Sequence, residues 1–71
     1  MTGEFTIEVT RHWDECNTFT EQAVEVIFLD NGFKYLKKGC KRFLVNTPKT
    51  RRRISFKVYN ASGKLMASYN F

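Results

Sequence analysis

The 71-residue chain has little of what staples very small proteins or builds catalytic and metal sites. Its two cysteines, Cys16 and Cys40, make no disulfide framework, and we expect both to be reduced and partly buried, with a bridge between them as the less favoured alternative. Together with His12 they are the only good soft metal ligands, fewer than the four of a structural zinc site. A nucleophile–base pair of His12 with either cysteine lacks a group to orient the histidine. These absences predict no metal, no cofactor and no enzymatic activity.

Long apolar runs are also missing, because no stretch approaches the roughly 20 residues of a membrane-spanning helix. The N-terminus MTGEFTIEV lacks the basic region and apolar stretch of a secretory signal, which predicts a cytoplasmic protein. The length predicts a single domain over residues 1–71 with a small core. A hydrophobic content of 42% and an aromatic content of 15% are typical of a folded chain.

Acidic residues are absent from the second half of the chain, and this is the feature that bears most directly on function. Residues 1–32 hold seven acidic residues and one arginine, a net charge of −6, whereas residues 33–71 hold eleven cations and no acid. A charge split of this kind indicates a nucleic-acid, membrane or acidic-protein partner. The sequence therefore predicts the class of partner but not its identity.

The first strand is clear from alternation. Apolar and polar residues alternate from Phe5 to Thr10, which predicts a half-buried strand with Phe5, Ile7 and Val9 inward. Trp13 follows this strand and is expected to pack over one end of the core.

Residues 21–31 allow two interpretations. The favoured one is a helix that begins at the N-cap Thr20, places Glu21 and Glu25 toward solvent and ends at Gly32 in a left-handed conformation. The alternative is a strand over Val24–Leu29 followed by an Asn31-Gly32 hairpin turn of type I′. The continuous apolar run from Val26 to Leu29 argues for the helix, because it does not alternate.

The remaining chain has a β pattern throughout. Strands are predicted over 33–37, over 41–46 with Phe43 and Val45 inward, and over 53–60 with Ile54, Phe56 and Val58 inward. A loop containing Gly63 then leads to a last strand over 64–71, in which Leu65, Ala67, Tyr69 and Phe71 share a face. The predicted fold is α+β, with one helix packed on a four- to five-stranded antiparallel sheet in the order β-α-β-β-β-β. If the ambiguous segment is a strand, an all-β small barrel is the alternative.

The basic half contains the predicted binding residues. Cations neutralise phosphates and release counterions, and an aromatic ring on the same surface can stack on a base. An exposed sheet face with this chemistry predicts a nucleic-acid-binding surface, while the alternative is that the cations only solubilise the sheet and protect its edges. The candidate nucleic-acid-binding residues are Lys37, Lys38, Lys41, Arg42, Lys49, Arg51, Arg52, Arg53, Lys57 and Tyr59.

In its size, its predicted single helix on a sheet and its lack of catalytic residues, the chain resembles the compact accessory proteins of bacteriophages and other mobile elements, including some anti-CRISPR proteins. No sequence motif is shared. The resemblance implies a viral inhibitor or adaptor that acts in the host cytoplasm on a host protein or a nucleic-acid-handling complex.

Three functions are therefore open: binding of DNA or RNA through phosphate contacts, inhibition of a host protein or nucleic-acid-handling complex, and self-association through opposite charge poles. Steep salt dependence with polyanions would favour the first, and stoichiometric capture of one host protein the second. Oligomers that dissolve in salt would favour the third.

Overall fold

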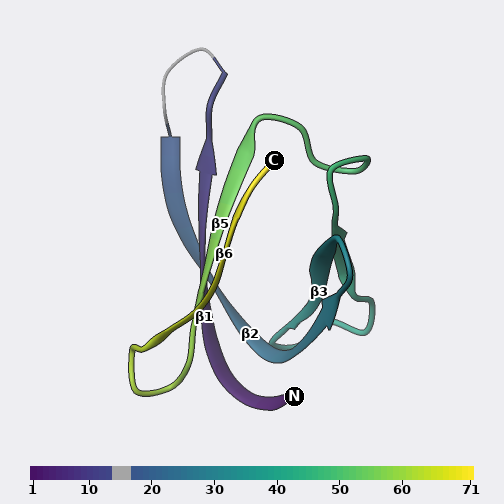
Figure 1. Cartoon of the computed structure of the whole chain (residues 1–71). Helices are drawn as coiled ribbons and strands as arrows, with labels where there is room; N and C mark the ends of the chain where they lie inside the picture. The colour runs from purple at the N-terminus through teal and green to yellow at the C-terminus, as the bar shows by residue number, and fades with distance from the viewer. Residues whose placement is uncertain (14–16) are drawn as a thin grey trace.

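The computed structural model describes residues 1–13 and 17–71, which form a single antiparallel sheet of six strands (Figure 1). The order across the sheet is β4-β3-β2-β1-β5-β6, so β4 and β6 are its two open edges. The strands are β1 (Thr2–Arg11), β2 (Asn17–Leu29), β3 (Gly32–Lys37), β4 (Leu44–Asn46), β5 (Ile54–Tyr59) and β6 (Leu65–Asn70).

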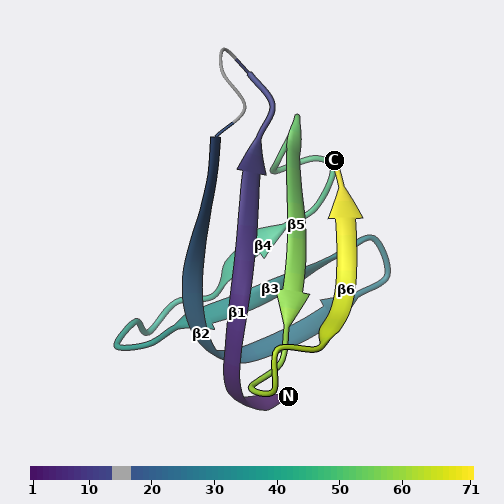
Figure 2. The same ribbon diagram turned by 90° about the vertical axis from the view of Figure 1, so that its left-hand side faces the viewer.

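The sheet folds over on itself because its longest strand bends. The first part of β2 pairs with β1, and its second part pairs with β3 after a register shift between Ala23 and Glu25. A second shift in β1, between Thr2 and Phe5, includes Gly3 at φ 144°. Bulges of this kind bend a strand and increase its twist. Two layers result, which we call the β1–β5–β6 layer and the β3–β4 layer (Figures 1 and 2).

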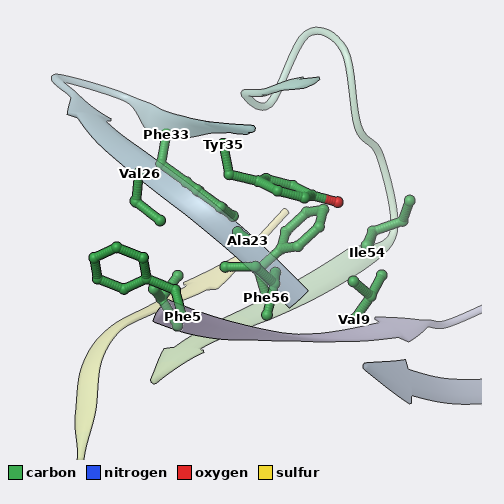
Figure 3. Packing of buried hydrophobic residues seen from close by; sticks show 10 residues of the cluster. Phe5, Val9, Ala23, Val26, Phe33, Tyr35, Ile54 and Phe56 are labelled. Carbon is green, nitrogen blue, oxygen red and sulfur yellow. The ribbon is translucent and has the colours of Figure 1, made fainter. Parts of the chain in front are cut away.

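Aromatic rings join the two layers. Phe33 of β3 is fully buried and stacks on Tyr69 of β6 at 4.9 Å between ring centroids. It also meets Phe56 of β5 edge-on at 5.3 Å. Figure 3 shows Phe33 and Tyr35 pointing toward Phe56 across the interior. Large aromatic side chains supply much apolar area per residue, which suits a small core, of ten buried apolar residues among those that the structure describes.

The predicted helix is wrong, and with it the α+β fold class: residues 17–29 form strand β2, and no helix occurs in residues 1–13 and 17–71. The all-β alternative fits, although the sheet is open rather than a closed barrel. The apolar run from Val26 to Leu29, which argued for the helix, belongs to the strand: Val26 is buried, whereas Phe28 and Leu29 are exposed. The bulge also adds one residue between Ala23 and Val26, which interrupts the alternation that indicates a strand.

The turn between β2 and β3 also differs from both interpretations. It consists of Asp30 and Asn31, and Gly32 is already the first residue of β3, paired with Leu29. Gly32 has no positive φ, so neither a left-handed helix end nor a type I′ turn accounts for it. A Cβ atom there would lie 2.1 Å from the carbonyl oxygen of Asn46. Glycine is needed because β4 passes so close.

The predicted strands in the second half of the chain agree with the structure in part. The strand over 53–60 is confirmed, with Ile54, Phe56 and Val58 buried. The strand over 41–46 is shorter, since β4 covers only Leu44–Asn46, and its faces are reversed: Leu44 packs on the core and Val45 is exposed. On β6, Ala67 and Tyr69 pack on the core as predicted, with Phe71 just beyond the strand, but Leu65 is exposed because the register shifts beside Tyr59.

Candidate nucleic-acid interface

Basic residues gather around the short edge strand β4. Nine of the twelve lysines and arginines fall in residues 34–53, which contain no acidic residue. This segment comprises most of β3, all of β4 and the loops on either side of β4, residues 38–43 and 47–53. Because three residues of strand span only about 10 Å, the two loops are held near each other.

The acidic residues belong mainly to the two central strands. Glu4 and Glu8 lie on β1, and Glu21 and Glu25 on β2, so the sheet order places the acidic strands between the two basic hairpins. The division seen in the sequence is therefore not a division into two hemispheres. Positive charge is concentrated on the β4 side, because β5, β6 and the loop between them add only Lys57 and Lys64.

The structure splits the predicted binding residues into two groups. Lys57 and Tyr59 lie on β5 and alternate with its buried residues, so they face outward from the β1–β5–β6 layer, and Lys57 is directly opposite Glu8 of β1. The other eight belong to the end of β3 and the two loops. Of these, Lys37 and Arg51 are half-buried. The exposed six, which we call the basic rim, are Lys38, Lys41, Arg42, Lys49, Arg52 and Arg53.

The loop over 47–53 is held in a defined shape. The Thr50 hydroxyl accepts a hydrogen bond from the Thr47 backbone N–H at 2.9 Å, and the backbone N–H of Arg51 donates to the Thr47 carbonyl at 2.9 Å. These bonds close a turn around Pro48 and Lys49, so that Lys49 is exposed at the tip. A loop closed in this way holds the backbone of its cationic residues in one arrangement.

Arg53 ends this loop in an unusual backbone conformation. Its φ of 62° is the only positive value for a non-glycine residue in the part of the chain that the structure describes. The conformation is held from both sides: the N–H of Arg53 donates to the Phe71 carbonyl, and its own carbonyl accepts from the His12 N–H. Its guanidinium donates to the carbonyl of His12 at 3.0 Å. A left-handed arginine is uncommon, and strain of this kind tends to occur at functional positions.

A cavity of about 430 Å³ opens between the two layers beside the basic rim. Both layers contribute to its walls: Val9, Ile54 and Phe56 come from one, and Tyr35 and Leu44 from the other. It also includes two cations, Arg11 at the end of β1 and Arg51 in the 47–53 loop. The site therefore combines apolar and aromatic walls with positive charge.

Arg51 is positioned by a buried amide. Asn46 of β4 is only 1% exposed, and its Oδ1 accepts a hydrogen bond from Arg51 Nε at 3.1 Å. The Nδ2 of Asn46 donates to the Leu44 carbonyl at 3.1 Å, which fixes the orientation of the amide. A buried polar side chain that is satisfied in this way defines the place of its partner.

The lining of the cavity also includes a carboxylate, that of Glu21. Tyr35 donates its hydroxyl hydrogen to Glu21 Oε2 at 2.6 Å, and Lys37 Nζ lies 3.8 Å from Glu21 Oε1. Burial, followed by the hydrogen bond to Glu21 and the charge of Glu21, raises the pKa of Tyr35 well above its ordinary range. The tyrosine hydroxyl is therefore protonated at neutral pH. Glu21, predicted to lie on the solvent face of a helix, instead lies on the inner face of β2.

At the mouth of the cavity, Arg11 stacks on two rings. Its guanidinium carbon lies 4.8 Å from the ring centroid of Phe19 and 5.7 Å from that of Trp13, both within cation–π range. The expectation that Trp13 packs over the core is wrong, because it is 37% exposed and lies against Arg11.

Sequence reasoning missed Arg11, Glu21, Tyr35 and Asn46 as site residues. For Arg11 a signal existed, because the alternation that places Phe5, Ile7 and Val9 inward continues to position 11. Glu21 requires the strand interpretation of β2, and Asn46 requires the reversed facing of β4. For these two residues the missing information was the register of β2 and β4 with their neighbouring strands, which decides the face on which each side chain lies.

The outer face of the β1–β5–β6 layer differs in character. His12 Nε2 lies 2.7 Å from Ser55 Oγ, which donates to Asn70 Oδ1 at 2.8 Å, so the single hydroxyl hydrogen is used and the histidine nitrogen acts as the donor. Thr10 and Thr18 exchange a hydroxyl hydrogen bond at 3.0 Å. Cys40 is free and exposed in the 38–43 loop, contrary to the partly buried position expected, whereas Cys16 lies outside the described residues.

No known protein family, curated protein or solved structure matches the chain. The single helix on which the resemblance to phage accessory proteins partly rested is replaced by strand β2. Within residues 1–13 and 17–71 there is no helix long and apolar enough to cross a membrane.

Proposed function

We propose that the protein is a non-enzymatic nucleic-acid-binding protein whose basic rim contacts the phosphate backbone. The observation that carries this proposal is the placement of nine cations, without an acidic residue, in the segment that forms β3, β4 and the flanking loops. The six rim residues are exposed and come from two loops on either side of one short strand.

Phosphate contacts of this kind give affinity without reading sequence. Each phosphate neutralised by a lysine or arginine releases condensed counterions, so affinity falls steeply as salt rises. The rim supplies charges on defined loops, and contacts between such charges and phosphate oxygens carry no direct information about the base sequence. We therefore expect tight binding at low salt with weak sequence preference.

As an edge strand, β4 is poorly suited to pairing with a strand of another protein. The strand has three residues, and the exposed Lys41 and Arg42 precede it. Short edges bordered by charges are how proteins prevent pairing with another strand. The cations around β4 serve that protective role as well, but protection alone does not require six exposed cations in two loops.

Fluorescence anisotropy with labelled single-stranded DNA, duplex DNA and RNA across a salt series tests the proposal. We expect Lys41→Ala with Lys49→Ala, one lysine from each loop, to flatten the log–log salt slope by about 1.4 with a single strand, or about 0.7 for each phosphate that is no longer neutralised. The matched control is Lys57→Ala with Lys64→Ala, which removes the same two charges from the β5–β6 side.

Equal losses of affinity in both double variants would contradict the proposal that the rim contacts the phosphates. They would indicate that affinity depends only on the net charge of the protein. No binding to any of the three probes at low salt would contradict nucleic-acid binding altogether. In that case an acidic protein surface becomes the partner class for the same cations.

A further inference from the structure

We infer that the cavity between the two layers binds one unstacked nucleotide of a single strand, with its base between the aromatic and aliphatic walls and its phosphate at Arg51 and Arg11. This inference rests on the proposed function and deepens it. The rim would hold the backbone on either side of the nucleotide, and the cavity would supply base contacts that the rim lacks.

The size and lining of the cavity suit such a ligand. Its volume of about 430 Å³ lies within the range of roughly 300–1,000 Å³ typical of small-molecule sites. Rings of Trp13, Phe19 and Phe56 line it together with the aliphatic Val9 and Ile54. Stacking on aromatic rings is the usual way in which proteins hold unpaired bases, and it contributes about 1–3 kcal/mol per base.

Arg51 is the better defined of the two phosphate ligands. Its bond to the buried Asn46 uses one of the five N–H donors of the guanidinium and fixes the plane of the group. A pre-positioned guanidinium loses less conformational freedom when it binds a phosphate in bidentate fashion.

Arg11 reaches the same cavity from the other layer. Its contacts with Phe19 and Trp13 hold the guanidinium against two ring faces, so the group is both a cation and a flat stacking surface. With Glu21 close to Lys37, the cavity has more positive than negative charge. An anionic ligand is therefore favoured over a neutral one.

The Glu21 carboxylate, which Tyr35 holds by a hydrogen bond, gives the site a base preference. A carboxylate accepts hydrogen bonds from exocyclic amino groups, as carboxylates do with the N4 amino group of cytosine. Uracil and thymine have carbonyl oxygens in place of an exocyclic amino group, which a carboxylate repels. We therefore expect amino-bearing bases to bind better than uracil or thymine.

Trp13 provides a direct probe, because it is the only tryptophan and it lines the cavity. We expect cytidine monophosphate to change its fluorescence saturably. Cytidine without the phosphate should bind at least ~10-fold more weakly, since about 1.4 kcal/mol corresponds to tenfold and charged hydrogen bonds contribute at least that. Uridine monophosphate should be weaker than cytidine monophosphate by about the same factor.

Two variants test which residues bind the phosphate and which set the base preference. Arg51→Gln should remove most of the advantage of the nucleotide over the nucleoside, and the isosteric Glu21→Gln should bring cytidine and uridine monophosphates to similar affinities. Lys57→Ala, on the outer face of β5, is the control and should change neither. Far-UV circular dichroism and a thermal melt check that each variant is folded.

The result that overturns the inference is the absence of a saturable change with any nucleotide, or an equal response to inorganic phosphate, which would indicate an anion site only. This failure can be told apart from failure of the rim. If Trp13 does not respond to nucleotides while single-stranded DNA still binds with a steep salt slope, the cavity is refuted and the proposed function stands. If nucleotides bind but the Lys41/Lys49 variant keeps its salt slope, the rim is refuted and the cavity stands.

Discussion

The two hairpins at the ends of this sheet are built in opposite ways. On one side, β5 and β6 are six residues each, are joined by a short loop and pair over most of their length. On the other side, β4 has three residues and is flanked by longer loops, the second of which leads to β5 and ends at Arg53 with its left-handed backbone. On the outer face of the regular side the Ser55 hydroxyl of β5 donates to the Asn70 side chain of β6, whereas the irregular side has most of the cations.

This difference shows how a small chain separates stability from binding. A long ladder satisfies backbone groups and fixes the aromatic core through Phe56 and Tyr69. The β4 side has fewer ladder bonds, so it depends on single close contacts. Two examples are the close approach of Gly32 to the Asn46 backbone and the hydrogen bond from Arg51 to the Asn46 side chain. Variants that break one such contact should therefore have larger effects here than on the β5–β6 side.

The largest effect is expected from Gly32→Ala. The new Cβ would lie 2.1 Å from the carbonyl oxygen of Asn46, and this neighbour is backbone that cannot rotate away. We expect a loss of about 3 kcal/mol or more in the free energy of unfolding, the upper end of overpacking effects, from a domain of this size that has only about 4–10 kcal/mol in total. Urea unfolding followed by circular dichroism measures it.

The matched variant is Gly63→Ala in the loop between β5 and β6. Gly63 has φ 83° and open space around its Cβ position, so alanine there loses only the roughly 1–2 kcal/mol that a left-handed backbone costs a residue with a side chain. This loss is partly offset because alanine restricts the unfolded chain more than glycine does. Equal losses of stability at both positions would contradict the claim that the β4 side rests on close contacts.

The same contrast explains how much of the fold could be predicted from the sequence. Where strands are regular, as in β1 and β5, alternation identified the inward residues Phe5, Ile7, Ile54 and Phe56 correctly. Where a bulge adds one residue, as near Val24, the period-two pattern shifts by one, and alternation no longer marks the strand. Periodicity in a single sequence does not separate a bulged strand from a helical turn, because pairing partners decide between them.

For the candidate site, the composition of the charged segment was readable and its arrangement was not. Lys57 was grouped with the loop cations because it alternates on an outward strand face, but sheet order places it opposite Glu8. The cavity residues Glu21 and Asn46 depend on which strand faces which across the fold. Which strands face each other is decided by contacts between residues far apart in the sequence, and the pattern of a single segment does not show these contacts.

A smaller effect, dependent on pH, is expected from Tyr35→Phe. The pKa of Tyr35 is raised in the folded state, so the unfolded chain loses its proton first as pH rises above about 10. The stabilisation is fully present below about pH 10 and is lost above it, at up to about 1.4 kcal/mol per pH unit. We expect the free energy of unfolding of the wild type to fall more between pH 9 and 11 than that of Tyr35→Phe.

Tyr69→Phe on the β6 side is the comparison for this titration. The pKa of Tyr69 is raised by burial without a carboxylate partner, so its removal should flatten the pH dependence less. If the free energy of unfolding had the same pH dependence in the wild type and in Tyr35→Phe, the raised pKa of Tyr35 in the folded state would be contradicted.

The smallest effect on stability is expected at Arg53, and it separates strain from binding. Arg53→Gly relieves a left-handed conformation worth about 1–2 kcal/mol but loses the bond to the His12 carbonyl and loosens the unfolded chain, so the net change should stay within about 1 kcal/mol. Arg53→Ala loses the same bond and keeps the strain, so it should be less stable than Arg53→Gly by about 1 kcal/mol.

Both Arg53 variants remove the same rim cation, so both should flatten the salt slope of single-strand binding equally, by about 0.7. Unfolding in urea and anisotropy on the same samples provide the two readouts. If binding instead followed stability, with Arg53→Gly nearly as tight as the wild type, the guanidinium would act only through the backbone that it holds. Equal losses of binding at unequal stability would mean that the guanidinium of Arg53 contacts the phosphate itself.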